Sequence, residues 1–210
     1  MIRTYFLLCC IIFVSETLSA QSVTEALAQL DKTSTIINQH SLPSPYNKLL
    51  TQPLMTKAIE SHYKRTAIIQ PIFAQHNVHN NTYVRTIIML IDPDKHRNQA
   101  KFAQKYKKAI VVELAFIKIN FAELPPRLIS DILNTNSPFG TLLVRYNIAI
   151  STKNRRYFAI KCDPNLVKIF HCNLNEPLYG RMNTIINAEN KKWLAQVVEV
   201  LPNSTRHIRG

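Results

Sequence analysis

The sequence predicts an α+β fold, in which helices cover a mainly antiparallel sheet of about six strands. Helical and β-rich patterns both occur, and most of the β-rich segments are joined by short polar connections, which is typical of antiparallel pairing. The chain after residue 20 also has the length of one domain and shows no internal repeat or low-complexity tract. We therefore expect residues 21–210 to form a single domain.

The amino-terminal residues 1–20 have the pattern of a signal peptide. Arg3 precedes an apolar run from Tyr5 to Val14, and a polar stretch ends at Ala20. The run has about ten residues whereas a membrane-spanning helix needs about 20, so a permanent membrane anchor is the weaker alternative. We expect cleavage after Ala20 and an exported protein, either periplasmic or secreted.

Three helices are expected in the first two thirds of the chain. Ser22 to Glu25 reads as a capping box that opens a helix running into the Ile36–Ile37 region. After a proline-rich connection, residues 54–63 form a second helix. A third helix begins at Leu124-Pro125-Pro126, because proline is favoured in a first helical turn.

β-rich runs supply the sheet. Three strands are expected before the third helix, at residues 66–73, 82–91 and 109–119. After Ser137-Pro138-Phe139-Gly140 and a short helical turn, four further strand candidates follow at residues 157–162, 166–172, 181–186 and 193–201.

The composition is strongly basic, with a formal net charge of +13. Such a charge attracts anions of many kinds, including nucleic acid and small carboxylates. The densest basic cluster, residues 95–108, matches no nucleic-acid-binding motif, so we read it as a solvated surface and expect no specific nucleic-acid partner. With only three glycines, the chain also lacks any glycine-rich loop for a nucleotide.

The cysteines and histidines predict no metal site and no cofactor. Cys9 and Cys10 lie in the apolar run of the predicted signal peptide. Cys162 and Cys172 remain, either as a disulfide or as two buried thiols. His76 and His79 lie in a polar loop without a neighbouring ligand set, so we expect solvated side chains there.

Four short segments occur in a characteristic order along the chain. They are Leu54-Met55-Thr56-Lys57, Tyr83-Val84-Arg85-Thr86, Ser137 to Leu143, and Tyr179-Gly180-Arg181 followed by Val198 to Pro202. A Leu-Pro-x-x-Ile pattern precedes the third segment, at residues 124–129. In this order the segments resemble the chorismate pyruvate-lyase family, and the resemblance covers roughly residues 50–202.

This resemblance implies helical flaps over an internal ligand pocket in the sheet. It also implies conversion of chorismate to 4-hydroxybenzoate and pyruvate without any cofactor. The substrate-binding positions fall on Met55, Arg85, Phe139 and Glu199. Arg85 would anchor a substrate carboxylate, and Glu199 would be the catalytic acid or base. The expected partner is a small aromatic or pre-aromatic carboxylate, and we expect a monomer.

Each site residue also has a structural alternative. Arg85 lies in an apolar strand, where it could pair with a core carboxylate or face solvent instead of a ligand. Met55 and Phe139 could be ordinary core residues. Glu199 lies three residues before Pro202, and a shift of one residue in strand register would turn it to the opposite face.

Three function classes follow from these observations. The first is a chorismate lyase-like enzyme. The second is a non-catalytic exported protein that binds a small aromatic carboxylate, and the third is a polyanion-binding protein.

Overall fold

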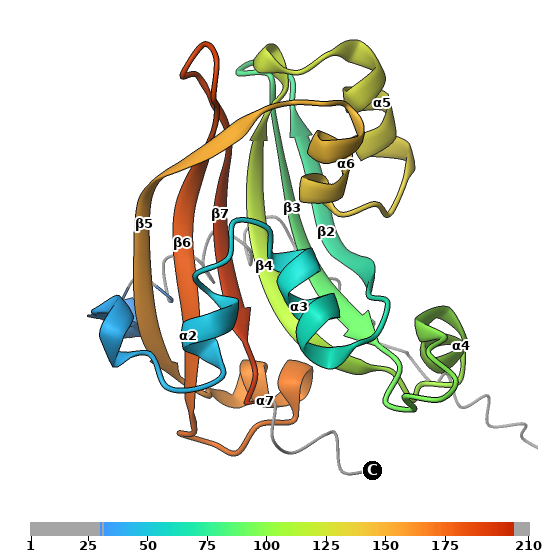
Figure 1. The fold of residues 1–210 in the computed structure, drawn as a ribbon, viewed down its shortest axis with the longest axis vertical. Helices are drawn as coiled ribbons and strands as arrows, with labels where there is room; N and C mark the ends of the chain where they lie inside the picture. The colour runs from blue at the N-terminus through green and yellow to red at the C-terminus, as the bar shows by residue number, and fades with distance from the viewer. Residues whose placement is uncertain (1–29, 31, 204–210) are drawn as a thin grey trace, which may run out of the picture.

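The protein is described by a computed structural model over residues 30 and 32–203, and the predicted α+β class is confirmed (Figure 1). Seven strands form one sheet in the order β1-β5-β6-β7-β4-β3-β2, and every neighbouring pair is antiparallel. The strands are β1 (Thr35–Ile37), β2 (Ile68–Asn77), β3 (Thr82–Ile91), β4 (Ile110–Asn120), β5 (Ile150–Lys161), β6 (Pro177–Asn187) and β7 (Trp193–Leu201).

Helices cover both faces of this sheet. They are α2 (Tyr46–Leu49), α3 (Met55–Tyr63), α4 (Ala100–Lys105), α5 (Pro126–Asn134), α6 (Phe139–Arg145) and α7 (Pro164–Phe170), with short 3-10 turns η1 (Gln39–Ser41) and η2 (Phe121–Glu123). In Figure 1, α3, α5 and α6 lie in front of the sheet. We call the face that they cover the inner face, and the opposite one the outer face.

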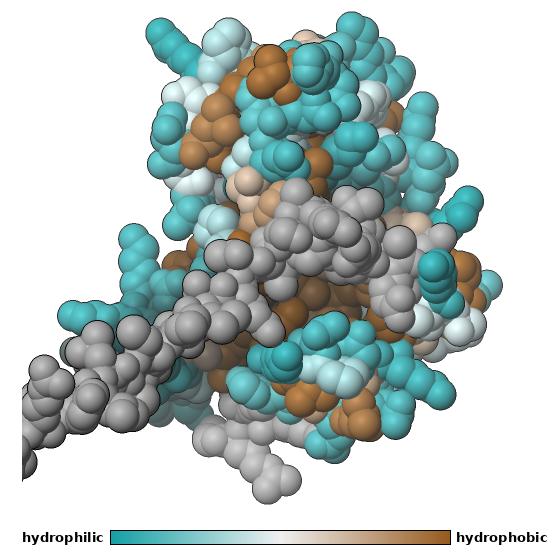
Figure 2. All heavy atoms as spheres, turned by 180° about the vertical axis from the view of Figure 1, so that it is seen from behind, coloured by the Kyte–Doolittle hydropathy of each residue, from teal (hydrophilic) through white to brown (hydrophobic). Residues whose placement is uncertain are grey.

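Two separate cores follow from the alternation of side chains along the strands. In β4, Ala115 and Ile117 point to the inner face and pack in the core that α3, α5 and α6 complete. Leu114 and Phe116 point to the outer face, where α7 packs. Because β4 is buried on both sides, its sequence is a nearly continuous apolar run. Figure 2 shows the molecule from behind, with hydrophobic residues in a hollow near the centre of this view.

Two of the expected elements are different in the structure. The predicted strand at residues 166–172 is wrong, because Pro164–Phe170 forms helix α7, which Asp163 caps by accepting hydrogen bonds from the backbone amides of Asn165 and Leu166. The predicted helical end at Ile36–Ile37 is also wrong. Residues Thr35–Ile37 form β1, which pairs with β5 at the sheet edge.

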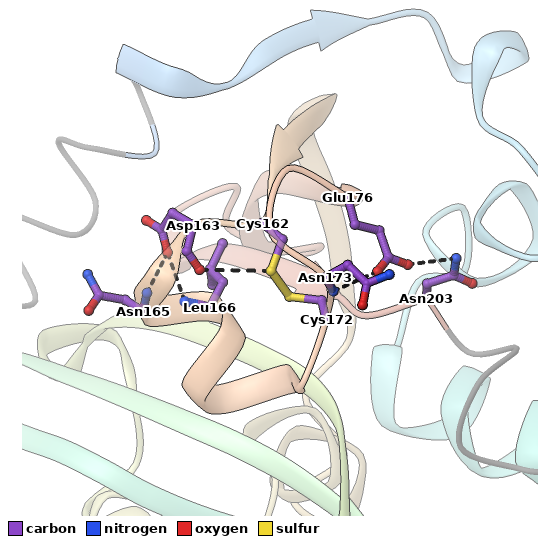
Figure 3. Close-up of a disulfide and its surroundings, with 8 residues drawn as sticks. All are labelled: Cys162, Asp163, Asn165, Leu166, Cys172, Asn173, Glu176 and Asn203. Atoms are coloured by element: carbon purple, nitrogen blue, oxygen red, sulfur yellow. Dashed lines mark hydrogen bonds between the residues drawn. A yellow bond between two sulfur atoms is a disulfide. The ribbon is translucent and has the colours of Figure 1, made fainter.

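A disulfide joins Cys162 and Cys172 across helix α7 (Figure 3). Their Cα atoms lie 6.4 Å apart, within the range that a bridge requires. Beside the bridge, Glu176 accepts hydrogen bonds from the backbone amide of Asn173 and from the side chain of Asn203. The covalent bond therefore joins the residue just before α7 to the residue just after it, within the connection between β5 and β6.

The basic cluster around α4 is anchored by one buried carboxylate. Asp92 accepts hydrogen bonds from Nε and Nη2 of Arg97 and from the backbone amides of Asp94 and Gln99. The hydrogen bonds from Arg97 are the main reason that the pKa of Asp92 is held far below its usual value, although burial opposes them. This interaction orders the loop that leads from β3 into α4.

Candidate functional site

A cavity of about 110 Å³ lies between the inner face of the sheet and helices α3 and α6. All four residues that the sequence singled out line it: Met55 from α3, Arg85 from β3, Phe139 from α6 and Glu199 from β7. They come from four elements that are widely separated in the sequence. The fold thus brings the predicted site residues into one place.

The strand register explains why the two charged residues face the same cavity. Glu199 lies opposite Arg181 on one side and Ala115 on the other, and Ala115 lies opposite Ile87. In this register Glu199 points to the inner face. The alternative in which its side chain turns to the outer face does not hold.

The two helical walls begin at the cavity. Helix α3 starts at Met55 after the extended residue Leu54, and α6 starts at Phe139 after its N-cap residue Pro138. Met55 and Phe139 are buried in the inner core as well as lining the cavity. The ligand-wall and core interpretations therefore both apply to these side chains.

Arg85 is a buried cation without an acidic partner among the described residues. Its side chain is 2% exposed, and its Nη2 donates one hydrogen bond, to the carbonyl oxygen of Ser137 at 3.3 Å. Its Nε is buried and has no hydrogen-bond acceptor within residues 30 and 32–203. Burial lowers the pKa of Arg85, yet a guanidinium stays protonated in proteins. Its charge is therefore left to be neutralised by something in the cavity.

Glu199 is already paired. Its carboxylate accepts a hydrogen bond from Nε of Arg181 in a buried ion pair, and Nη1 of Arg181 also donates to the carbonyl oxygens of Leu50 and Gln52. Burial acts against the charge on Arg181, but Glu199 and Glu113 outweigh it and raise the pKa of Arg181. Arg181 thus holds Glu199 in place and links β6 to the segment after α2.

Glu113 is a second carboxyl group in the cavity, which the sequence analysis did not single out. It comes from β4 and is 2% exposed. Burial is the main cause that raises its pKa well above the usual value, and the negative charge of Glu199 adds to it. A lone glutamate in the apolar run Ile110 to Phe116 was the signal that could have marked it.

Asn183 also lines the cavity and was missed. Its side chain comes from β6, two residues after Arg181 on the same face, and only 7% of the residue is exposed. Its Oδ1 is buried and has no hydrogen-bond donor in the described part of the chain. Asn183 and Arg85 are thus two residues of the cavity wall that carry a buried unsatisfied acceptor and a buried unsatisfied donor.

The buried charges around the cavity sum to one positive charge, because Lys57, which also lines the cavity, is exposed to solvent. Arg181 and Glu199 neutralise each other, and the raised pKa of Glu113 favours its neutral form. Arg85 supplies the remaining charge. The site is therefore complementary to a small monoanion. No group of three or more metal-ligating side chains occurs within the described residues.

Comparisons with known proteins establish a shared fold for this chain. No family model matches it, and no curated protein matches it either. The structure of PhnF from Mycobacterium smegmatis aligns with a TM-score of 0.50 and 11% identity, and the alignment covers 88% of this chain and 81% of PhnF. At this identity the similarity establishes the fold and not an activity. The chorismate pyruvate-lyase resemblance is thus supported only as far as a related fold.

Two weaker structural neighbours are parts of regulators. The ligand-binding domain of a GntR-family transcriptional regulator from Bordetella bronchiseptica aligns with a TM-score of 0.42 and 10% identity over 69% of this chain and 89% of its own. The C-terminal domain of a histidine utilization repressor from Pseudomonas syringae has the same TM-score and identity, over 69% of this chain and 96% of its own.

These neighbours contradict two of the sequence-based predictions. None of the structures named above is described as a lyase, so the prediction of a lyase that converts chorismate to 4-hydroxybenzoate and pyruvate does not stand. The prediction of a periplasmic or secreted protein does not stand either, because none of these structures is described as that of an exported protein. Residues 1–20, the predicted signal peptide, lie outside the described residues. In the described part of the chain, no helix has the length and apolar character needed to cross a bilayer.

Proposed function

We propose that this protein is a receptor domain whose internal cavity binds a small organic monoanion, with a carboxylate on Arg85, and releases it unchanged. The observation that carries the proposal is the buried guanidinium of Arg85, which lines the cavity and has no acidic partner in the described residues. A buried unpaired charge is expensive, and a ligand carboxylate would relieve it through a two-pronged, charge-assisted hydrogen bond.

The size of the cavity limits the ligand. A closed apolar cavity of about 150 Å³ accommodates a benzene ring, and this cavity measures about 110 Å³. A short acyclic acid therefore fits without movement, whereas a ligand with a single ring requires α3 or α6 to move outward. The apolar lining from Met55, Ile117 and Phe139 favours a ligand whose body is apolar.

Binding without conversion is supported by the state of the two carboxyl groups. Glu199 is engaged by Arg181, which has further hydrogen bonds that hold it in place. Glu113 lies beside Glu199 rather than beside Arg85 in the register of the sheet. A sensor role also agrees with the ligand-binding domains of GntR-family regulators among the structural neighbours.

The test is a binding assay with matched variants. Isothermal titration calorimetry of the full chain with benzoate and short aliphatic carboxylates should show one binding site per chain. Arg85→Met removes the charge while it keeps most of the volume, and we expect affinity to fall at least about 100-fold, the effect of losing a charge-assisted pair. Mass spectrometry of the recovered ligand should show no chemical change.

Thr86→Val is the control variant. Thr86 neighbours Arg85 in β3, is fully buried and carries a hydroxyl without a partner in the described chain, but it does not line the cavity. Its replacement should leave affinity unchanged. If Arg85→Met bound the carboxylates as tightly as the unmodified protein, the anion site would have to be elsewhere and the proposal would fail.

A further inference from the structure

We infer that Asn183 determines ligand specificity, by selecting carboxylates that carry a hydrogen-bond donor at the end remote from the carboxylate. The inference rests on the proposed function, because it takes Arg85 as the carboxylate anchor. It adds a second point of recognition on the opposite side of the cavity.

The unsatisfied acceptor of Asn183 is the first support. The residue lines the cavity, and its Oδ1 is buried and meets no donor from residues 30 and 32–203. A buried carbonyl-type oxygen without a donor is destabilising by about 1–3 kcal/mol. Leucine would fill similar space in this apolar surrounding without that penalty, so the polar side chain is explained by a donor that a ligand brings.

The position of Asn183 relative to Arg85 is the second support. The register places Asn183 opposite Val197, Val197 opposite Ile117, and Ile117 opposite Arg85. The two polar residues thus end one row of four side chains across β6, β7, β4 and β3. Three strand spacings separate their Cα atoms, which is roughly 14 Å.

Between these two polar ends, Val197 and Ile117 form an apolar floor that lines the cavity. A ligand lying along this row would place its carboxylate at Arg85, its apolar body over Ile117 and Val197, and its far end at Asn183. A hydroxyl or an amino group at that end can donate to Oδ1, whereas a methyl group cannot.

The ionic groups next to Asn183 do not satisfy it. Arg181 lies two residues away on β6, and it donates hydrogen bonds to Glu199, Leu50 and Gln52. A ligand donor therefore meets an acceptor that the protein itself leaves open, and a ligand without such a donor would bury it unpaired.

The experiment compares 4-aminobenzoate with 4-methylbenzoate, which are close in size and differ in the donor. Titration of the unmodified full chain should show at least about a tenfold preference for the amino compound, which corresponds to about 1.4 kcal/mol. In Asn183→Leu and Asn183→Ala the preference should disappear, while 4-methylbenzoate still binds. Thr86→Val should keep the preference, and thermal melts should establish that each variant is folded.

The outcomes separate the two proposals. Equal affinity of the unmodified protein for both compounds would overturn the role of Asn183 and leave the Arg85 site standing. Persistence of the preference in a folded Asn183 variant would overturn it as well. Failure of the unmodified protein to bind either compound, or any other small carboxylate, would refute the proposed function together with this inference.

Discussion

Arg85 and Glu113 show two different solutions to the same problem, a charged group in an apolar site. Glu113 can take up a proton, and its raised pKa shows that burial and the charge of Glu199 favour this form. Arg85 cannot give up its proton under ordinary conditions. Of the two groups, only Arg85 therefore keeps a charge without a counter-ion among the described residues, and in the proposed function a ligand anion supplies that counter-ion.

The raised pKa of Glu113 predicts how stability depends on pH. Above the ordinary glutamate pKa of 4.5, the unfolded chain loses this proton while the folded protein keeps it, so the free energy of unfolding falls as pH rises toward the folded-state pKa. Glu113→Gln removes this dependence. The free energy of unfolding of this variant, relative to that of the unmodified protein, should increase between pH 4 and pH 7, by up to about 1.4 kcal/mol per pH unit.

Urea unfolding at several pH values measures this difference. Glu189→Gln, which removes an exposed carboxylate, is the control and should run parallel to the unmodified protein. If the free energy of unfolding of Glu113→Gln also ran parallel to that of the unmodified protein across pH, Glu113 would be ionised in the folded state. The buried charges around the cavity would then sum to zero instead of one positive charge.

At the level of single residues, the sequence predicted those site residues that belong to a recognisable motif. Met55, Arg85, Phe139 and Glu199 were chosen from a resemblance in short segments, and all four line the cavity. Arg181 lay within one of these segments but received no role. The ion pair that gives it one depends on the register of β6 and β7, which the local sequence does not encode.

At the level of elements, Gly180 allows β6 to pass close to its neighbours. A Cβ atom at this position would lie 2.4 Å from the carbonyl oxygen of Glu199 and 2.4 Å from Cζ of Phe158. Both contacts are too short for real atoms, and the backbone oxygen cannot move without shifting β7. The absence of a side chain at Gly180 is thus a condition for the strand pairing that positions Arg181 and Glu199.

Gly180→Ala should therefore destabilise the protein by about 1–3 kcal/mol, the usual effect of overpacking. Gly140→Ala is a matched control in α6, because its Cβ would lie 2.9 Å from Cδ2 of Leu54, at the movable end of a side chain. Its effect should be clearly smaller, since alanine also favours the helix. Denaturant midpoints of the two variants test the contrast, and an equal loss in both would contradict this account.

The mistaken strand at residues 166–172 shows how two local signals compete. The residues Leu166 to Phe170 are mostly apolar and include β-branched side chains, which favoured a strand. Asp163 followed by Pro164 is a helix-start signal, and it prevailed because α7 buries Leu166 and Phe170 on the outer face. The helix-start signal at Asp163 and Pro164 thus predicts this element better than the apolar residues that follow it.

At the level of the whole molecule, the cavity depends on the strand order. Strands β6 and β7 come last among the strands, yet β7 lies against β4, whose other neighbour is β3. This arrangement places Arg85 and Glu199 over a common inner face although 114 positions separate them in the sequence. A single sequence predicted an antiparallel sheet but not this order, since loops do not specify which distant strands pair.

The distribution of elements around the sheet leads to a prediction about ligand-induced protection. Helices α3 and α6 wall the cavity on the inner face, whereas α7 packs on the outer face and is closed by the Cys162–Cys172 bridge. A ligand that binds between α3, α6 and the sheet suppresses openings of these helices, because such openings expose the site. Openings confined to α7 leave the site intact.

Hydrogen exchange followed by mass spectrometry should therefore show slower exchange in Met55–Tyr63 and Phe139–Arg145 when a carboxylate is bound. At 100 times the dissociation constant the stabilisation amounts to about 2.7 kcal/mol, or up to about 100-fold in rate for amides that exchange through those openings. Peptides from Pro164–Phe170 should change much less, provided that they exchange by local opening. Protection confined to α7, or absent from both cavity helices in a ligand-saturated sample, would place the bound anion outside this cavity.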